Sequence, residues 1–455
     1  MTSSRAQGLI DEDEVATACR AALELPPADG VEVLVLASNT GLTRYARSEI
    51  IQNIERRELR AYVRAIIGTK NATATTNQLD EKSLKEAARR ALEAASASRP
   101  DEEWPGLPTP SEVGKTTPLW RWDEDTATAS PDDRSNVVEQ VLGIAGENAA
   151  GFYETSAHAY GIFSSTGIRC FDAHTRSVLT CLADRGGGTG WSQGSAVRRQ
   201  DIDAEAVAAR ALHKASASAP ASEAEPGLYE VVLEPAAVAD LLDYLSYVGF
   251  GAKQVIEGES FLASRTGQVV AAPNVTVADD AAHPASIGIG FDFEGVPKQR
   301  VAVIDEGVAT GPVTDRRTAR MMGLPVTGHA SGSNEYGPIA ANVVMAPGEA
   351  STEELVAGVD RGLLVTRFHY VNVLDRPTSL LTGMTRDGTF RIDKGEIREP
   401  VHNLRFSQSV LEALQNVEAV GRELHSFAPE WGSFGSTVTP ALRIGAFRFS
   451  STTSH

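Results

Sequence analysis

Residues 231–254 read VVLEPAAVADLLDYLSYVGFGAKQ, and the organisation of the whole chain can be worked out from this stretch. Its first residues are apolar and β-branched, which favours a short strand. Pro235 follows, and the apolar residues after it predict a helix over 236–250. Asp243 and Tyr244 lie in the middle of that helix. A carboxylate on a segment with the composition of a core has three possible explanations. The segment is a working site, a plain buried helix, or a place where chemistry is expected and missing.

The segment just before this stretch divides the chain. Residues 215–227 read ASASAPASEAEPG, and small residues, Pro and Glu cannot build a core. A chain of 455 residues is also too long for one ordinary core. We therefore expect an α+β protein with an N-terminal α+β domain over 1–220, built of sheets and Ala-rich helices, and a mostly β C-terminal domain over 225–455.

Periodicity predicts the elements on either side of this boundary. Strand signals occupy 31–78, where residues 50–68 contain two alternating runs that could pair, and antiparallel hairpins are expected over 151–199. Residues 99–131 are rich in Pro, Asp, Glu and Thr and are expected to be an exposed connection. Helices besides 236–250 are predicted over 79–98, 132–150, 203–218, 314–322, 351–358 and 407–424.

Composition excludes several classes of protein. Hydrophobic residues make up 42 % of the chain and charged residues 22 %, the balance of a soluble globular protein. The net charge of −18, without a basic stripe, argues against nucleic acid and anionic membrane as partners. No apolar run is long enough to span a membrane, and the first residues lack the apolar core of a secretory signal. Three cysteines cannot form a disulfide framework, and we read Cys170 and Cys181 as strand cysteines; the expected location is the cytoplasm.

A search for chemistry in the residues themselves gives few candidates. The closest two of the nine histidines are sixteen residues apart, so no helix carries a histidine pair at zinc-binding spacing. The run Gly186–Gly190 is expected to form a hairpin or flexible loop rather than a ligand cradle. Asp292 and Glu294 lie two apart in a predicted strand, a spacing that suits acid–base work but more often belongs to a solvated face or a structural hydrogen-bonding corner. His329 lies in a glycine-bracketed loop of the kind that contacts ligands.

Several segments together resemble one known family. The boundary EPGLYEVVLEP is followed by FDFEGVPKQR (291–300), ARMMGLPVTGHASG (319–332) and GTFRIDKGEIREPV (388–401). No single piece is specific, but their order over more than 350 residues resembles that of the TldD/PmbA family of paired peptidase subunits. In that family the TldD-type subunit binds zinc through HExxxH on a helix and a Cys near the C-terminus. The PmbA-type subunit, also called TldE, lacks these ligands and forms a hollow dimer with TldD.

The resemblance answers the question raised by the helix after VVLEP. By position, the first His of HExxxH falls on Asp243, the Glu on Tyr244 and the last His on Val248. The segment EWGSFGSTVTPALRI (430–444), which resembles the part that bears the Cys ligand, offers Ser433 and Ser436 but no Cys. Both departures indicate the PmbA/TldE-type subunit.

The resemblance implies a non-catalytic subunit of a zinc metallopeptidase heterodimer that cleaves unfolded or leader-like peptides in an enclosed chamber. It implies no catalytic or metal-binding residue and no cofactor in this chain, zinc in a TldD-type partner with HExxxH, and a role that fits the maturation of peptide natural products. Candidates to face the chamber are Asp243, Tyr244, His329 and Ser433. Two alternatives stay open: a stand-alone hydrolase with an altered site, which would also use Asp292 and Glu294, and a homodimeric peptide-binding protein.

Overall fold

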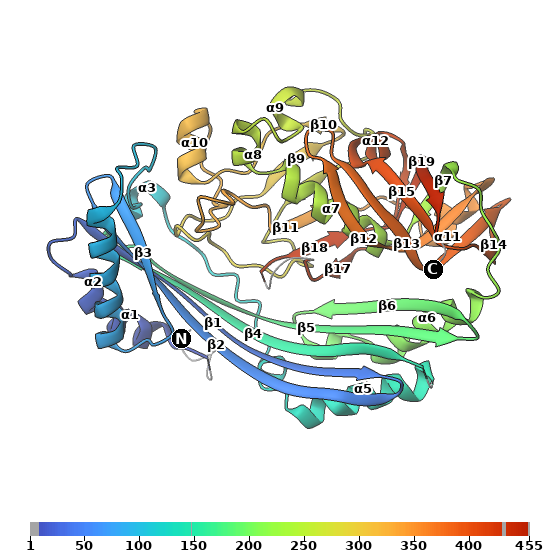
Figure 1. The fold of residues 1–455 in the computed structure, drawn as a ribbon, viewed down its shortest axis with the longest axis horizontal. Coiled ribbons are helices and arrows are strands. Elements are labelled where there is room, and N and C mark those ends of the chain that lie inside the picture. Colours follow the sequence, from blue (N-terminus) through green and yellow to red (C-terminus); the bar gives the residue numbers. More distant parts are fainter. Residues whose placement is uncertain (1–8, 147, 430–433, 454–455) are drawn as a thin grey trace.

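The structure is a computed structural model, and it describes residues 9–146, 148–429 and 434–453. The predicted α+β class is confirmed, because three sheets and several helices make up the fold. One long sheet is built from the N-terminal part of the chain and two others from residues after 226. Figure 1 shows the six long strands curving beneath the C-terminal sheets.

The N-terminal sheet is antiparallel throughout, in the order β3-β2-β1-β4-β5-β6. Its strands are β1 (Gly30–Ala46), β2 (Glu49–Ile67), β3 (Lys70–Thr76), β4 (Ala150–Ser164), β5 (Arg169–Arg185) and β6 (Gly188–Ala196). The expectation of two pairing runs over residues 50–68 was wrong, because this segment is one strand that pairs with β1 along its length. No Gly or Pro interrupts it, so nothing in the sequence turns the chain.

The two faces of this sheet have different partners because side chains alternate along a strand. Odd-numbered residues such as Val33 on β1 and Leu179 on β5 pack under four helices. Even-numbered residues such as Leu34 and Ile162 pack instead against Phe291 of the C-terminal region. The helices are α1 (Glu12–Leu23), α2 (Glu81–Ala97), α5 (Pro131–Ala145) and α6 (Ala204–Ala217). The predictions over 79–98, 132–150 and 203–218 are confirmed, whereas α1 was not predicted.

The connection over 99–131 is more structured than expected. It contains the short helices α3 (Pro110–Val113) and α4 (Glu124–Ala127), and Trp104 within it is buried. The carboxylate of Asp172 on β5 accepts the backbone N–H groups of Leu119 and Trp120, at 2.9 and 3.1 Å. These bonds hold the segment against the sheet because a buried carboxylate requires donors.

The C-terminal region contains a ring of strands. The order β12-β7-β19-β15-β13-β14 closes on itself because β12 also pairs with β13. The strands are β7 (Gly227–Leu233), β12 (Arg361–Asp375), β13 (Leu380–Asp393), β14 (Glu396–Pro400), β15 (Leu404–Ser409) and β19 (Leu442–Thr452), and β16 (Val417–Val420) pairs with β19.

The third sheet has the order β10-β9-β8-β11-β18-β17. Its strands are β8 (Val277–Asp279), β9 (Val301–Asp305), β10 (Val308–Ala309), β11 (Asn342–Met345), β17 (His425–Phe427) and β18 (Ser436–Thr439). The remaining short helices are α8 (Ala252–Ile256), α9 (Leu262–Arg265), α10 (Arg316–Met322), α11 (Thr352–Ala357) and α12 (Val410–Gln415), besides a 3₁₀ turn at Arg199–Asp201.

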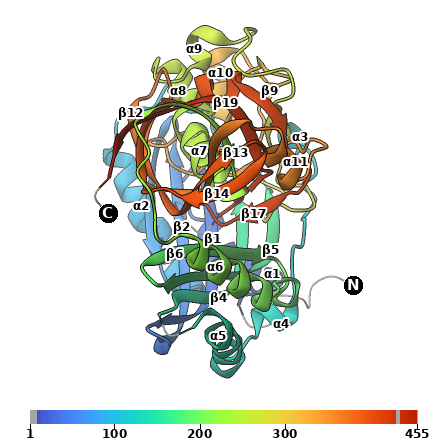
Figure 2. The same cartoon turned by 90° about the vertical axis from the view of Figure 1, so that its right-hand side faces the viewer.

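The predicted helix after VVLEP is α7 (Pro235–Gly249), and it occupies the C-terminal core. Figure 2 looks onto the ring of strands with α7 drawn among them, and the buried side chains of both share one core. Leu242 and Leu245 are fully buried there. The carboxylate of Asp240 accepts the backbone N–H of Phe368 on β12 at 2.8 Å, which fixes the helix against the ring.

The expected helix over 407–424 was wrong. The structure has the end of β15, the six-residue helix α12 and then β16. Ser409 caps α12 by accepting the N–H of Glu412. The β-branched Val417 and Val420 then pair with β19, because side chains of this shape fit a pleated surface better than a helix.

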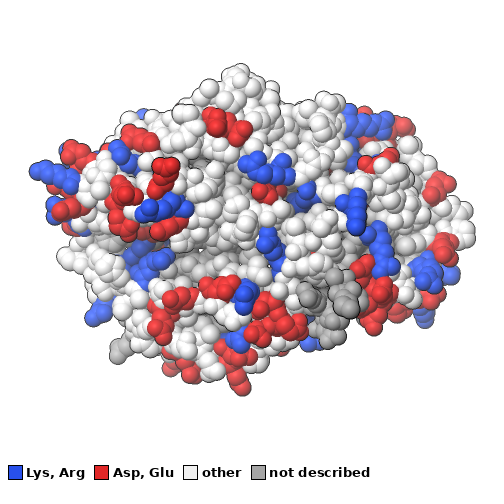
Figure 3. Space-filling model, turned by 180° about the vertical axis from the view of Figure 1, so that it is seen from behind, with Lys and Arg blue, Asp and Glu red and all other residues white. Residues whose placement is uncertain are grey.

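The surface charge and the free state of the cysteines agree with the expectations from the sequence. In the parts of the chain that the structure describes, no helix is long and apolar enough to cross a membrane. On the face shown in Figure 3, acidic and basic side chains are interspersed, and acidic ones gather along the lower edge. Cys170 and Cys181 are free and buried on opposite faces of the same strand, β5, as expected of strand cysteines.

The glycine run is part hairpin and part packing surface. Gly186 and Gly187 turn the chain between β5 and β6 with φ of 62° and 86°, as the hairpin prediction required. Gly190 on β6 lies directly under α6, where an added Cβ would be 2.2 Å from the backbone oxygen of Ala211. The glycine therefore sets how closely the Ala-rich helix approaches the sheet.

Gly190→Ala is expected to lower the free energy of unfolding by about 1–3 kcal/mol, because the added methyl group forces the helix and strand apart. Gly143→Ala is the matched control. Gly143 is exposed on α5 with nothing within 4 Å of an added Cβ. That change is expected to stabilise by about 0.5–1 kcal/mol through helix propensity. Urea unfolding followed by circular dichroism measures both, and an undiminished stability of Gly190→Ala would contradict the close packing.

Candidate functional site

One face of α7 borders an open pocket of about 590 Å³. Asp243, Ser246 and Tyr247 are three and four residues apart, a spacing that places side chains on one side of a helix. The remaining walls are mostly apolar and come from the segment before β11, from β11 itself and from the region of β18: Tyr336, Ile339, Ala340, Ala341, Val343, Pro429, Phe434 and Thr437. The pocket thus combines one carboxylate with a largely apolar lining, the composition typical of small binding sites.

Asp243 is partly buried in the wall of this pocket. The hydroxyl of Thr437 on β18 donates a hydrogen bond to its carboxylate. This contact orients the carboxylate toward the seam between α7 and the third sheet. Of the residues proposed to face a chamber and described by the structure, Asp243 is the one that lines this pocket.

Tyr244 points in another direction. Its hydroxyl donates to the backbone carbonyl of Val371 on β12, and its ring packs against the buried core of the C-terminal region. Val248, one turn further along the helix, is 0 % exposed. The three positions compared with HExxxH therefore do not converge on one point: Asp243 borders the pocket, while Tyr244 and Val248 face the core.

Of the two serines near the C-terminus, the structure describes one. Ser433 lies outside the described residues. Ser436 begins β18, is 1 % exposed, and accepts the backbone N–H of Ile287 through its hydroxyl oxygen at 2.9 Å. Within the described ranges no group of three or more His, Cys, Asp or Glu side chains is placed to hold a metal ion.

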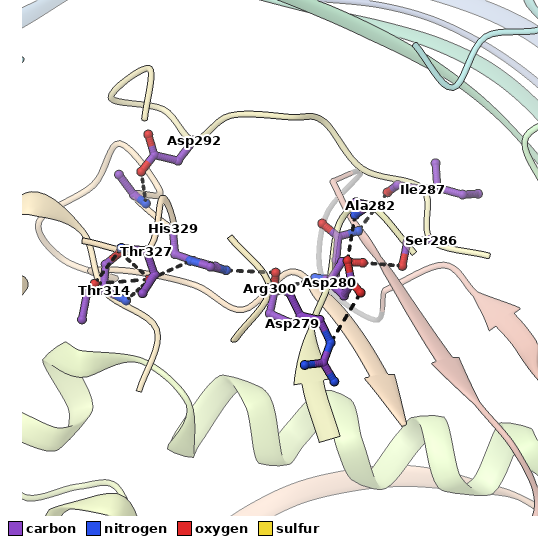
Figure 4. A network of polar contacts seen from close by, with 12 residues as sticks. Asp279, Asp280, Ala282, Ser286, Ile287, Asp292, Arg300, Thr314, Thr327 and His329 are labelled. Carbon is purple, nitrogen blue, oxygen red and sulfur yellow. Dashed lines mark hydrogen bonds and ion pairs between the residues drawn. The ribbon is translucent and has the colours of Figure 1, made fainter. Parts of the chain in front are cut away.

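His329 is buried in a polar network rather than exposed in a loop (Figure 4). Its Nε2 lies 2.9 Å from the carboxylate of Asp279, and its Nδ1 lies 2.9 Å from the hydroxyl of Thr327. A neutral imidazole that donates through Nε2–H and accepts at Nδ1 satisfies both contacts. With its side chain 0 % exposed, His329 connects the loop to β8 and does not reach a cavity, in contrast to the expected chamber-facing position.

The charges in this network follow from burial and neighbours. Burial opposes ionisation of Asp279, but the nearby Lys298 charge and the hydrogen bonds from His329 and the Asn342 backbone outweigh it and lower the pKa to about 2. Burial, followed by the Lys298 charge, lowers the pKa of His329 below its ordinary value. The pair is therefore an ionised carboxylate with a neutral imidazole at neutral pH.

The expectation that Asp292 and Glu294 lie on one face of a strand was wrong, because the chain turns here. Asp292 accepts the backbone N–H groups of Glu294, Val296 and Ala330, each within 2.9 Å. This arrangement is the structural hydrogen-bonding corner, one of the alternatives that the sequence allowed. Burial raises the pKa of Asp292 above its ordinary value. Burial, followed by the charges of Asp292 and Asp315, raises the pKa of Glu294 as well.

Sequence reasoning missed most of the pocket wall. Tyr247 carries a usable signal, since it lies four residues after Asp243 on a predicted helix. Tyr336 and Phe434 carry none, because they come from segments about a hundred residues apart that only the fold brings together.

His329→Gln is expected to cost about 1–3 kcal/mol of unfolding free energy at pH 7, because the buried carboxylate of Asp279 loses a well-placed donor. The lowered pKa of His329 means that the unfolded chain binds a proton that the folded chain does not. The contribution of His329 to the free energy of unfolding is therefore complete above about pH 6.5. It falls by up to about 1.4 kcal/mol per pH unit below that value.

Urea unfolding at pH 7 and pH 5 tests this, since the variant should lose less stability between the two values than the unsubstituted chain does. The exposed His213 of α6 provides the control, and His213→Gln is expected to stay within about 0.5 kcal/mol at pH 7. Equal losses for His329→Gln and the unsubstituted chain would contradict a neutral buried imidazole.

Comparison with known proteins agrees with this fold. Residues 226–451 match the family model of the PmbA/TldA metallopeptidase C-terminal domain. A metalloprotease of Methanothermobacter thermautotrophicus is 28 % identical over 254 residues, covering 55 % of each chain. A metalloprotease TldD homologue of Haemophilus influenzae is 29 % identical over 261 residues, which are 54 % of this chain and 52 % of that protein. The chain thus spans about half the length of the curated relatives that it matches.

Among solved structures, the crystal structure of TldE from Thermococcus kodakarensis has the same fold, with a TM-score of 0.84 at 21 % identity. The match covers 96 % of this chain and 99 % of the other. Family model, relatives and fold agree, and the chain belongs to the TldD/PmbA metallopeptidase family.

Proposed function

We propose that this chain is the non-catalytic, TldE/PmbA-like subunit of a TldD/TldE-type zinc metallopeptidase heterodimer. The complex cleaves unfolded or leader-like peptides in an enclosed chamber in the cytoplasm, a substrate class that fits the maturation of peptide natural products. One observation carries the proposal: at the helix position where the zinc-bearing subunit has HExxxH, this chain has Asp243, Tyr244 and Val248.

The environment of these residues supports a non-catalytic role. Val248 has no ligand atom and is fully buried. The Tyr244 hydroxyl already donates to the Val371 carbonyl, so it is not arranged as a general base. A lone Asp243 carboxylate would hold zinc weakly, since structural and catalytic zinc sites use three or four protein ligands. The zinc and the base are therefore assigned to the partner subunit.

The pocket beside α7 suits a supporting role in peptide binding. Its apolar walls can take an apolar side chain, while the Asp243 carboxylate can accept a backbone N–H or a basic group of the peptide. Main-chain hydrogen bonds of an extended peptide would add affinity without demanding a particular sequence. The chain thereby shapes which peptides reach the partner's zinc.

Co-expression with the HExxxH family member of the same genome tests the proposal. Size exclusion followed by a zinc assay on each separated subunit is expected to give a one-to-one complex with zinc in the partner only. The complex, and not this chain alone, is expected to cleave an unfolded peptide such as reduced, alkylated insulin B chain. A zinc-loaded homodimer of this chain that cleaves the peptide would overturn the proposal, and a zinc-free homodimer that binds it without a partner would favour the peptide-binding alternative.

Asp243→Ala in the complex is expected to raise KM for the peptide about tenfold, which corresponds to about 1.4 kcal/mol of lost binding. The zinc content and kcat should stay close to their original values, because the chemistry belongs to the partner. Asp393→Ala removes the same charge from an exposed hairpin position and serves as the control. Loss of zinc from the Asp243→Ala complex would contradict the assignment, because it would make this carboxylate a ligand.

A further inference from the structure

A second polar group lies on the even-numbered face of the six-stranded sheet. His158 on β4 is directly opposite His174 on β5, and Arg176 follows two residues later on the same face. The two imidazole rings stack with centroids 4.9 Å apart. All three residues are more than nine-tenths buried, at 5 %, 0 % and 6 % exposure. None of them has a role in the function proposed above.

These side chains are not satisfied by the protein that surrounds them. Among the described residues, no hydrogen-bond partner exists for Nε2 of His158, for either ring nitrogen of His174, or for Nε and Nη1 of Arg176. Buried polar groups in native proteins nearly always have partners, because an unpaired one loses its hydration without compensation. Several unpaired groups in one cluster therefore mark a place where a polar ligand can bind.

The neighbouring carboxylates do not fill this role. Asp172, on the same face, accepts the backbone N–H groups of Leu119, Trp120, Ala173 and Gly290. Glu154 reaches only the remaining Arg176 nitrogen, at 3.5 Å. The Arg176 charge is thus paired with Glu154, while the two imidazoles and two Arg176 nitrogens keep unpaired polar atoms.

A pocket of about 600 Å³ leads to the cluster. His158 and Tyr160 form one wall, and β1 and β2 form the other with Ser38, Glu58 and Arg60. Arg60 is exposed on the same sheet face, because it pairs with Leu36, whose side chain packs on that face. The pocket thus has Arg57, Arg60 and His158 in its lining, while His174 and Arg176 lie beside His158 on the sheet and outside the lining.

We propose that this pocket binds a carboxylate group of a peptide, which Arg60 and His158 contact and which the buried Arg176 and His174 stabilise. The proposal rests on the proposed function, since a peptide in the chamber supplies the carboxylate. The Arg60 guanidinium can give a carboxylate a charge-assisted hydrogen bond, and a neutral imidazole can donate to it through its N–H. A peptide C-terminus and an Asp or Glu side chain offer the same group.

A cation does not fit the same place. The Arg176 charge lies beside both imidazoles, and burial with this charge lowers the pKa of His158 to about 3. Burial, His158 and Arg176 likewise lower the pKa of His174. The Arg176 charge would repel a positive ion and attract an anion. Glu58 at the rim disfavours a multiply charged anion and leaves a single carboxylate as the best match.

Isothermal titration calorimetry on the full chain tests the proposal with three N-acetylated peptides. The first is Ala-Gly-Ser-Ala-Ala with a free C-terminal carboxylate, the second is its C-terminal amide, and the third is the amide with Glu replacing Ser. The free acid is expected to bind at least tenfold more tightly than the amide. Tight binding of the Glu peptide as well would assign the pocket to any carboxylate, and weak binding would assign it to the C-terminus.

Arg60→Gln and His158→Gln are each expected to weaken binding of the free acid about tenfold, as loss of one hydrogen bond to a charged carboxylate implies. Arg60 is exposed, so its variant remains informative even if a change at His158 disturbs folding. Arg89→Gln on α2 removes the same charge away from the pocket and is the control. Equal binding of acid and amide, no binding of any of the peptides, or an effect of Arg60→Gln no larger than that of the control would overturn the proposal.

The two proposals fail in different ways. A heterodimer that cleaves peptide acids and amides alike, and is unaffected by Arg60→Gln, would leave the proposed function standing and remove the carboxylate site. Carboxylate-dependent binding by this chain, without any peptidase activity of the complex, would keep the site and remove the proposed function.

Discussion

The two-residue alternation of side chains along β1, β4 and β5 is the constraint on which the rest of the structure depends. These strands run 17, 15 and 17 residues and pair in register along most of their length. One set of residues is covered by helices and the other meets the C-terminal region. A shift of one residue in any strand would exchange the two sets, so the helices and the C-terminal sheets together fix the register. The same alternation places His158, His174 and Arg176 on the inner face.

The helix α7 owes its position to a second set of constraints. Its apolar side chains are buried with the ring of strands, and Asp240 and Tyr244 bond to the backbone of β12. The Lys214 ammonium of α6 pairs with Glu234 just before the helix and donates to Thr366 at 3.0 Å. These contacts leave the face with Asp243 directed to the pocket. A helix held in this way can shape a binding surface without carrying the chemistry itself.

The sequence predicted those parts of the fold in which local preference and final environment agree. The Ala-rich helices, the antiparallel hairpins over 151–199 and α7 were found from periodicity and turn residues. The helix expected over 407–424 failed because pairing with β19 overrides local preference there. Asp243 stood out as a charge in an apolar helix, but Phe434 and the rest of the pocket wall depend on contacts between distant segments. The burial of His329 likewise follows from its partner on β8, which no local pattern reveals.

The central claim is that the chain supports a zinc site without contributing a ligand to it. X-ray diffraction from crystals of the purified heterodimer, with data collected on both sides of the zinc absorption edge, tests this most directly. The account predicts one anomalous peak per heterodimer, within the HExxxH helix of the partner and without a ligand from this chain. A peak bound by Asp243, or by any other side chain of this chain, would contradict it.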